Sequence, residues 1–522
     1  MTDKIRFSAF LLLLLCFTTG LYSQKPDKAE KKIKPELIKE YVDFLASDSL
    51  KGRDTPSEGL DIAADYISAK FAKFKLNKVN GSYFQTVPLY TRDLDIKGCL
   101  LRITGLAASK TFDLSTDFIP YYMTADKQVD AEIVFAGYGI SAPEYNYDDY
   151  SGIDVKGKIV LVLTHEPGEL DTCSIVFGKK STKYPLLSEK FRNAKSKGAA
   201  GLIVVTDPLN HILLKPQGSP WPSLSKFSRH INLPLEFQVE QVDSIPVIQI
   251  GENVIKYLFG SIDSLKKIQK GIDKSGKPNS FLLKGFNCEL ATKPLITKYE
   301  TQKNVVGYIE GSDEKLKDEF VVIGGHYDHV GFSKSHSDGE DYIFNGADDN
   351  ASGTAGTMAV AKAFSSMKKK PARSILFILF AGEEKGLYGS RYYCDNPLFP
   401  LDKTVAMLNM DMISRNGTDS LQLEGGIKNP DLLEIMLNEN KGLGLTYIPT
   451  KDDLFGRSDH YNFFVKGITA VDITGGLHKD YHTVRDNPDS IDNDKAARIS
   501  RLVFRSAKVI ANDNKRYRVV RK

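Results

Sequence analysis

The sequence predicts an α/β fold with a mixed, mostly parallel central sheet that is flanked by helices. Three apolar runs carry this prediction, and they are Phe320–Ile323, Ser374–Phe380 and Val405–Met410. Each run is short and rich in branched or aromatic residues, which is typical of a strand buried on both faces. A stretch of small residues from Gly353 to about Met367 predicts a helix between the first two runs. Strands that alternate with helices in this way pair in parallel.

The adjacent carboxylates Glu383 and Glu384 are the most informative feature of the chain. They follow the second apolar run after Ala381 and Gly382. Two acids at the exit of a buried strand are costly unless the protein uses them. Since neighbouring side chains point in different directions, one carboxylate can bind a metal ion while the other faces a bound water, as metal-assisted hydrolysis requires. The alternative interpretation is a solvated helix start, where acids are favoured.

Further candidate ligands lie near the ends of the other predicted strands and at the start of the predicted helix. They are His326, Asp348 or Asp349, Asp411 and His482. His482 follows a fourth apolar run, Ile468–Ile473, and a glycine-rich loop. Because the carboxyl ends of parallel strands meet at one edge of an open sheet, we expect these side chains to converge there. Mixed imidazole and carboxylate ligands favour zinc over manganese or cobalt.

Six motifs between about residues 300 and 510 resemble those of the co-catalytic di-zinc aminopeptidases, a family that includes secreted bacterial leucine-type aminopeptidases and glutamate carboxypeptidases. The motifs are GGHYDH, GADDNASG, AGEEKGLYGS, NMDMI, GRSDH and YHT. The resemblance implies two zinc ions per chain. In that arrangement His326 and Asp411 hold one ion, Glu384 and His482 hold the other, and Asp349 bridges both. Counted back from Ala351-Ser352-Gly353, the bridging acid is Asp349 rather than Asp348, and the resemblance implies a cis peptide between Asp349 and Asn350.

The resemblance also implies roles for four residues that do not bind the metal. Glu383 is expected to be the general base, and Tyr481 is expected to donate a hydrogen bond to the developing oxyanion. Asp328 is expected to orient the His326 ring, and Arg457 to contact substrate. The implied activity is an exported di-zinc aminopeptidase that hydrolyses N-terminal peptide bonds with a metal-activated water. Its partners would be the N-termini of peptides or proteins.

Three other functions stay open on the same residues. A carboxypeptidase or dipeptidase would use the same metal core. A glutaminyl cyclase would have a related fold and a single zinc ion. A surface protein that binds a partner without catalysis would have lost ligands, whereas none of the implied ligands is missing here.

The start of the chain predicts export. Lys4 and Arg6 precede the apolar run Phe10–Phe17, and smaller residues follow through Ser23, which is the pattern of a cleaved signal peptide over residues 1–23. The apolar run is too short for a stable membrane span. We therefore expect a periplasmic, cell-surface or secreted protein. The net charge of +4 does not suggest a nucleic-acid partner.

The length of 522 residues predicts more than one domain. We assign residues 24–94 and 296–513 to a peptidase domain, residues 95–295 to an insert, and residues 514–522 to a solvated basic tail. The insert resembles a protease-associated (PA) domain, a β-rich α/β unit, in the stretches GYGISAPEYNYDDY, VKGKIVLV and KGAAGLIVV. We interpret its histidines, His165, His211 and His230, as structural or surface residues. We also expect the insert to wall one side of the active-site cleft.

Overall fold

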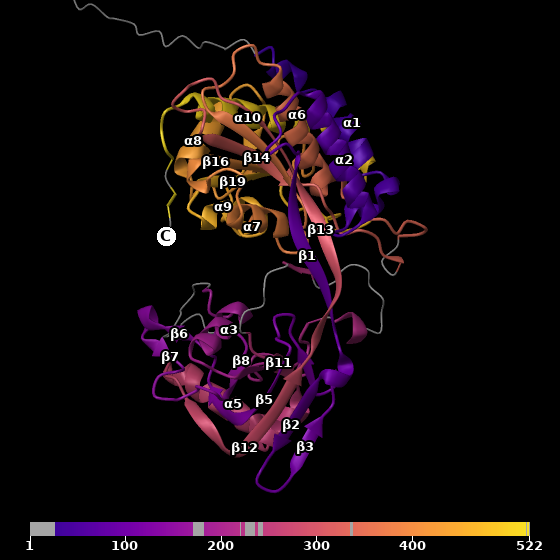
Figure 1. The fold of residues 1–522 in the computed structure, drawn as a ribbon. Coiled ribbons are helices and arrows are strands. Elements are labelled where there is room, and N and C mark those ends of the chain that lie inside the picture. The colour runs from indigo at the N-terminus through magenta and orange to yellow at the C-terminus, as the bar shows by residue number, and fades with distance from the viewer. Residues whose placement is uncertain are drawn as a thin grey trace, which may run out of the picture.

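The computed structural model places the chain in two domains that are joined by a pair of long strands (Figure 1). It describes residues 27–170, 182–219, 221–224, 235–237, 244–334, 338–517 and 519–520. The expected signal peptide and His230 lie outside these residues. Among the helices described, none is long and apolar enough to cross a membrane. Cys99, Cys288 and Cys394 are free thiols.

The first domain is built on a nine-stranded sheet. In spatial order its strands are β10 (Leu235–Phe237), β1 (Phe84–Leu94), β13 (Pro294–Ile309), β15 (Ser374–Phe380), β14 (Phe320–His326), β16 (Thr404–Met410), β19 (Ala470–Thr474), β17 (Ser420–Glu424) and β18 (Thr446–Tyr447). The four strands β15, β14, β16 and β19 pair in parallel. β13 and β17 flank this parallel centre in antiparallel orientation. The sheet is therefore mixed, as the sequence predicts, and the predicted strands form its parallel centre.

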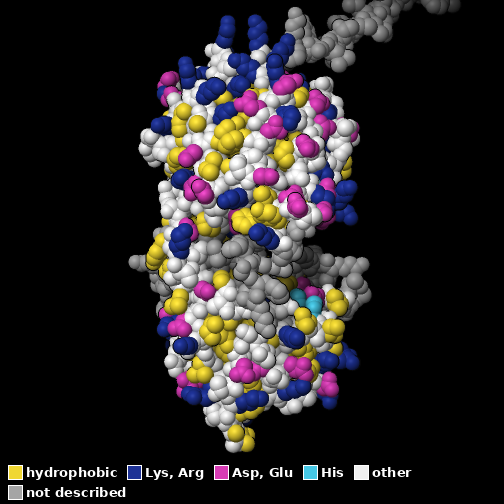
Figure 2. All heavy atoms as spheres, turned by 90° about the vertical axis from the view of Figure 1, so that its right-hand side faces the viewer, with side chains coloured by type: hydrophobic (Ala, Val, Ile, Leu, Met, Phe, Trp, Pro, Cys, Tyr) yellow, Lys and Arg dark blue, Asp and Glu magenta, His cyan; other side chains and the backbone are white. Residues whose placement is uncertain are grey.

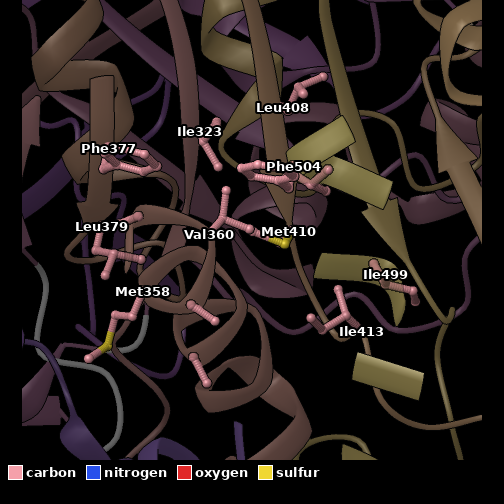
Figure 3. Packing of buried hydrophobic residues seen from close by; sticks show 14 of the residues in the cluster. Ile323, Met358, Val360, Phe377, Leu379, Leu408, Met410, Ile413, Ile499 and Phe504 are labelled. Atoms are coloured by element: carbon pink, nitrogen blue, oxygen red, sulfur yellow. The ribbon is translucent and has the colours of Figure 1, made fainter. Parts of the chain in front are cut away.

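Helices cover both faces of this sheet. One face packs against α1 (Pro35–Leu45), α2 (Glu58–Lys73), α6 (Gly353–Ser365) and α10 (Asn493–Asn512), and the other packs against α7 (Tyr388–Asp395) and α9 (His460–Val465). The alternation of side chains along a strand explains the two layers. In β15, Phe377 and Leu379 face the first group of helices, whereas Ile378 faces the second. Figure 3 shows Phe377 and Leu379 beside Met358 of α6 in that buried layer. A further helix, α8 (Pro430–Glu439), packs against α10.

The second domain is built on an eight-stranded sheet. Its strands, in spatial order, are β3 (Ser109–Phe112), β2 (Leu100–Thr104), β12 (Ser280–Thr292), β5 (Lys127–Ala136), β8 (Ile159–Leu163), β9 (Gly201–Val205), β11 (Val247–Ile250) and β4 (Phe118–Pro120). The strands β5, β8, β9 and β11 run parallel. The domain also contains α3 (Leu187–Ser196), α4 (Glu252–Phe259), α5 (Ile262–Ser275) and the short pair β6 (Ser141–Ala142) and β7 (Tyr147–Asp148).

The chain passes between the domains through β1 and β13. The whole of β1 pairs with β13, from Phe84 opposite Val305 to Leu94 opposite Pro294, with one irregularity after Thr91. Figure 1 shows the two strands running together out of the first domain, which is the upper one in this view, towards the second, lower domain. The two points where the chain passes from one domain to the other therefore lie close to residues 95 and 295, the ends of the range that we assigned to the insert.

One short piece of that range belongs to the first domain. β10 pairs with β1 in the nine-stranded sheet, although residues 235–237 lie within the expected insert. The Phe237 ring lies 5.0 Å from the ring of Tyr388 and 5.8 Å from that of Tyr392, and the Arg391 guanidinium lies 4.5 Å from its centroid. This contact joins the insert to α7, the helix that follows Glu383 and Glu384.

The described residues of the basic end of the chain contact the first domain and stay largely exposed. Arg516 forms a 2.6 Å ion pair with Glu319, and the Val520 N–H donates to the Lys428 carbonyl at 2.9 Å. The side chains of Lys515 and Arg516 are nevertheless 74% and 48% exposed.

Candidate metal centre and active site

The predicted ligands meet at the carboxyl edge of the parallel strands. His326 is the last residue of β14, Asp411 follows β16 directly, and Glu384 comes four residues after β15. Asp349 precedes α6, and His482 lies in the loop after β19. The Thr354 hydroxyl of α6 donates to the His326 carbonyl at 2.7 Å, which ties the end of β14 to the start of the helix.

Asp349 lies between two groups of ligand atoms. Its Oδ1 atom is 3.4 Å from His326 Nε2, and Asp411 Oδ1 is 3.4 Å from the same nitrogen. Its Oδ2 atom is 3.1 Å from His482 Nε2, and that nitrogen is 3.1 Å from Glu384 Oε2. One carboxylate thus faces both groups with different oxygens, as a ligand that bridges two ions must. The peptide bond between Asp349 and Asn350 is cis, as the resemblance implied.

Asp348, the other candidate for the bridging position, points away from this centre. Its carboxylate accepts the backbone N–H of Ser414 at 2.8 Å and that of Arg415 at 3.2 Å. Asp486, which we did not predict, is fully buried and accepts the N–H groups of Asp348 and Asp349 at 3.0 Å. These bonds fix the backbone that presents Asp349.

The charge balance of the centre calls for cations. Asp349, Glu383, Glu384 and Asp411 have side chains that are at most 14% exposed, and Asp411 Oδ1 has no hydrogen-bond partner. Buried carboxylates are stable only when they are paired or coordinate a metal. The geometry and the mixture of imidazole and carboxylate atoms fit two divalent ions of the zinc type.

The histidines of the centre respond to the same negative charge. Burial opposes a charge on His326, but Glu383 and Asp411 raise its pKa well above the usual range. Burial likewise opposes a charge on His482, whereas hydrogen bonds to Asp349 and Glu384 raise its pKa to about 10. The acids of the centre therefore favour positive charge at the ring nitrogens where metal ions would bind.

Glu383 lies in the first ligand group, beside His326 and Asp411, and outside the second. Its Oε2 atom is 3.9 Å from His326 Nε2, and its backbone N–H donates to Asp328 Oδ1 at 3.2 Å. Burial, together with the charges of Glu384 and Asp411, raises the pKa of Glu383 well above its ordinary value. A carboxyl group with a raised pKa can accept a proton and return it.

Asp328 links Glu383 to the first histidine. Its Oδ1 atom lies 3.5 Å from His326 Nδ1, and its Oδ2 atom accepts the Thr55 hydroxyl at 3.0 Å. The His326 nitrogen that faces Asp328 is the one turned away from Asp349. This is the position from which a carboxylate orients a ligand ring, as the sequence prediction requires.

Tyr481 and Arg457 form one wall of the centre. The Tyr481 ring stacks on His482 with 3.8 Å between the centroids, and Arg457 Nη2 lies 3.1 Å from the phenol oxygen. Burial and the charges of Asp349 and Glu384 raise the pKa of Tyr481, so the phenol keeps its proton and can donate it in a hydrogen bond.

Sequence reasoning missed His329. This fully buried residue places Nδ1 2.8 Å from Glu384 Oε1 and 3.8 Å from Asp349 Oδ2, so it joins the His482 group as a possible ligand. Gly346 makes room for it, since a Cβ atom there would lie 2.4 Å from the His329 ring. The available signal was the second histidine of the GGHYDH motif, three residues after His326.

A cavity of about 450 Å³, open to solvent, lies beside the metal ligands. Its lining residues are Asp349, Glu383, Asp411, Met412, Leu454, Arg457, Ser458, Asp472, Thr474, Leu477 and Tyr481. All of them belong to the first domain. The expectation that the insert walls this cleft therefore finds no support among the described residues.

Comparisons with known proteins agree with this geometry. Residues 304–507 match the sequence profile of "Peptidase family M28", and residues 129–258 match that of "PA domain". The chain is similar to Aminopeptidase YwaD of Bacillus subtilis, with 24% identity over 43% of this chain and 48% of the relative. It is also similar to Leupeptin-inactivating enzyme 1 of Streptomyces exfoliatus, with 34% identity over 30% of this chain and 33% of the relative. The match thus spans about half or less of these curated relatives.

A solved structure extends the similarity to both domains. It is an aminopeptidase from Aneurinibacillus sp. strain AM-1, with a TM-score of 0.52 and 20% identity over 94% of this chain and 96% of that one. At this identity the match establishes the fold and not the activity.

Proposed function

We propose that this chain, which belongs to peptidase family M28 through residues 304–507, is an exported zinc aminopeptidase with two metal ions per chain. The observation that carries the proposal is the position of Asp349 between two complete ligand groups, with Glu383 beside them. The similarity to Aminopeptidase YwaD supports the activity. The expected export signal supports the location outside the cytoplasm.

The ligands divide between the two ions as the geometry groups them. His326 and Asp411 would hold one ion, Glu384 and His482 the other, and Asp349 both. When bound, zinc supplies Lewis acidity and lowers the pKa of a coordinated water towards about 7. His329 is placed to join the second ion or to hold Glu384 in position.

The remaining residues move protons and hold charge. Glu383 accepts the proton of the attacking water and passes it to the leaving amine, for which its raised pKa suits it. The Asp328 carboxylate holds Glu383 in position by accepting the Glu383 backbone N–H. The Tyr481 phenol donates a hydrogen bond to the oxygen of the scissile carbonyl as negative charge develops there.

The acidity of the cavity favours the amino end of a peptide. Asp472 lines the cavity, is 5% exposed and belongs to neither ligand group, so it can face a substrate ammonium group. Arg457 is the observation that favours a carboxypeptidase or dipeptidase as the second candidate, because a guanidinium group binds a terminal carboxylate well. The carboxylates of the cavity outnumber this one cation.

Blocked peptides separate these candidates. A peptide with a free amino end and an amidated carboxyl end should be cleaved, and the same peptide with an acetylated amino end should resist cleavage. The reverse result would favour a carboxypeptidase. A metal content of one zinc per chain, with cyclisation of N-terminal glutamine, would point to the cyclase. A fully loaded protein that cleaves no peptide would leave only the binding protein.

A further inference from the structure

A second cluster of metal-ligating side chains lies in the insert, far along the chain from the centre described above. It consists of His165, Glu169, Asp207 and His211. His165 Nδ1 lies 2.5 Å from Asp207 Oδ1 and 3.7 Å from Glu169 Oε2. His211 Nε2 lies 3.0 Å from Glu169 Oε2 and 3.7 Å from Asp207 Oδ1. Each histidine therefore faces both acids.

The cluster sits where a parallel sheet offers a site. His165 follows the end of β8, and Asp207 follows the end of β9. These strands are parallel neighbours, with Leu163 paired to Val205 at their carboxyl ends. Open α/β sheets bind ligands at this edge, so the insert repeats the placement of the metal centre in the first domain.

Asp207 is held in the manner of a ligand carboxylate. Its side chain is fully buried, and it accepts hydrogen bonds from the Thr164 hydroxyl at 2.7 Å and from Gln269 Nε2 at 3.2 Å. Groups of this kind fix the direction of metal ligands and are part of built sites. His165, Glu169 and His211 have side chains that are 33%, 28% and 36% exposed, so an ion can enter from solvent.

We propose that the insert binds a third divalent transition ion, zinc by preference, through His165, Glu169, Asp207 and His211. Four ligands at zinc bond lengths of about 2.0–2.1 Å form a tetrahedron whose edges are about 3.3 Å long. Three of the four separations given above lie between 3.0 and 3.7 Å. The fourth, at 2.5 Å, is the hydrogen bond between His165 and Asp207, which the ion replaces.

The side-chain chemistry selects the class of ion. Two imidazoles and two carboxylates suit zinc, whereas calcium and magnesium take oxygen ligands. The two imidazole rings stack with 4.1 Å between their centroids and 19° between their planes. Figure 2 shows histidine side chains at the surface of the lower domain beside acidic ones.

The site would join two loops of the insert. Glu169 and His165 come from the loop after β8, and His211 comes from the segment after β9. An ion that binds the folded insert and not the unfolded chain stabilises it by mass action. The site uses no residue of the catalytic centre, so it does not depend on the proposed peptidase activity.

Zinc content tests the proposal. The full-length protein is stripped with a chelator and dialysed against zinc, and the bound metal is measured by mass spectrometry. The double variant His165→Ala/His211→Ala should bind one ion fewer per chain than the wild type. The matched control, His482→Ala, should lose zinc from the catalytic centre and keep the ion of the insert. Hydrolysis of an aminoacyl reporter should stay within about twofold of wild type in the double variant and fall in the control.

A single substitution guards against failure of the double variant to fold. Glu169→Gln changes one partly exposed carboxylate, and it should weaken zinc binding to the insert tenfold or more in competition with a chromophoric chelator. Equal zinc content in the wild type and the folded double variant would overturn the proposal. So would an unchanged zinc affinity in Glu169→Gln.

Discussion

Replacement of Glu383 by glutamine tests the division of roles between the adjacent carboxylates. The substitution keeps the size of the side chain and removes its ability to accept a proton. Proton transfer by a positioned group contributes about 10²–10⁴-fold to a rate, which corresponds to about 3–5.5 kcal/mol of transition-state stabilisation. We expect kcat to fall by that factor, while KM and zinc content stay close to the wild-type values, because His326 keeps Asp349 and Asp411 at 3.4 Å, closer than Glu383 at 3.9 Å.

The pH dependence of the stability of the metal-free protein provides a second measurement on Glu383. At 3.9 Å and an effective dielectric constant of about 20, Glu383 and a charged His326 attract each other by about 4 kcal/mol. Even so, burial and the neighbouring acids raise the pKa of Glu383 well above 4.5. A raised pKa in the folded state stabilises the protein below the unfolded pKa, and this contribution is lost as pH rises through the folded pKa. Glu383→Gln should therefore raise the unfolding temperature of the metal-free protein at pH 8, relative to wild type, more than at pH 4.

The matched control is Glu384→Gln. Glu384 lies 2.8 Å from His329 Nδ1 and 3.1 Å from His482 Nε2, so its substitution should remove zinc as well as activity. Steady-state kinetics and metal analysis of both variants decide the question. If Glu383→Gln lost zinc and Glu384→Gln kept it, the roles that we assign to the two carboxylates would be reversed and the reasoning refuted.

Three further predictions concern the neighbours of this pair. His329→Ala should lower zinc affinity by about 10–100-fold in a chelator competition, since it removes a possible ligand or the partner of Glu384; an unchanged affinity would exclude both roles. Zinc added to the metal-free protein at pH 7.5 should release about two protons per chain, because the pKa of His326 lies well above its usual range and that of His482 is about 10. Calorimetry in buffers of different ionisation enthalpy measures the number of protons released. Release of no protons would contradict the charge balance that we describe for the centre. Phe237→Ala should lower the free energy of unfolding by about 1–3 kcal/mol without loss of zinc, since it removes aromatic and cation–π contacts with α7. A denaturant titration that shows an unchanged free energy of unfolding would mean that β10 does not anchor the insert.

The central strands of the sheet in the first domain could be predicted because they are buried on both faces. β14, β15 and β16 are continuous apolar runs, and the residues that follow them carry the chemistry. β13 is different, since its stretch Thr297–Glu300 is polar and partly exposed, and only the last part lies in the core. A strand that serves two domains has no single hydrophobic period, which is why no continuous apolar run marks β13 in the sequence.

The same reasoning could not choose between residues whose position depends on distant partners. The apolar pattern alone left Asp348 and Asp349 as equal candidates, and only the resemblance to the peptidase motifs selected Asp349. In the structure the amides of Ser414 and Arg415 distinguish the two acids by binding Asp348. His165 and His211 looked unrelated because they follow different strands of the insert. Only the pairing of β8 with β9 brings them within reach of the same two carboxylates.

The ladder between β1 and β13 has a consequence for how this protein could be rebuilt. Since Leu94 lies opposite Pro294, residues 95–293 amount to the turn of one long hairpin. The entropic cost of closing such a connection grows only slowly with its length. A tight Asn-Gly turn could replace the second domain together with β10, and another domain with adjacent termini could be grafted at the same point. The first domain could therefore serve as a scaffold that carries different second domains. A set of such chimaeras would show which features of substrate choice depend on the second domain alone.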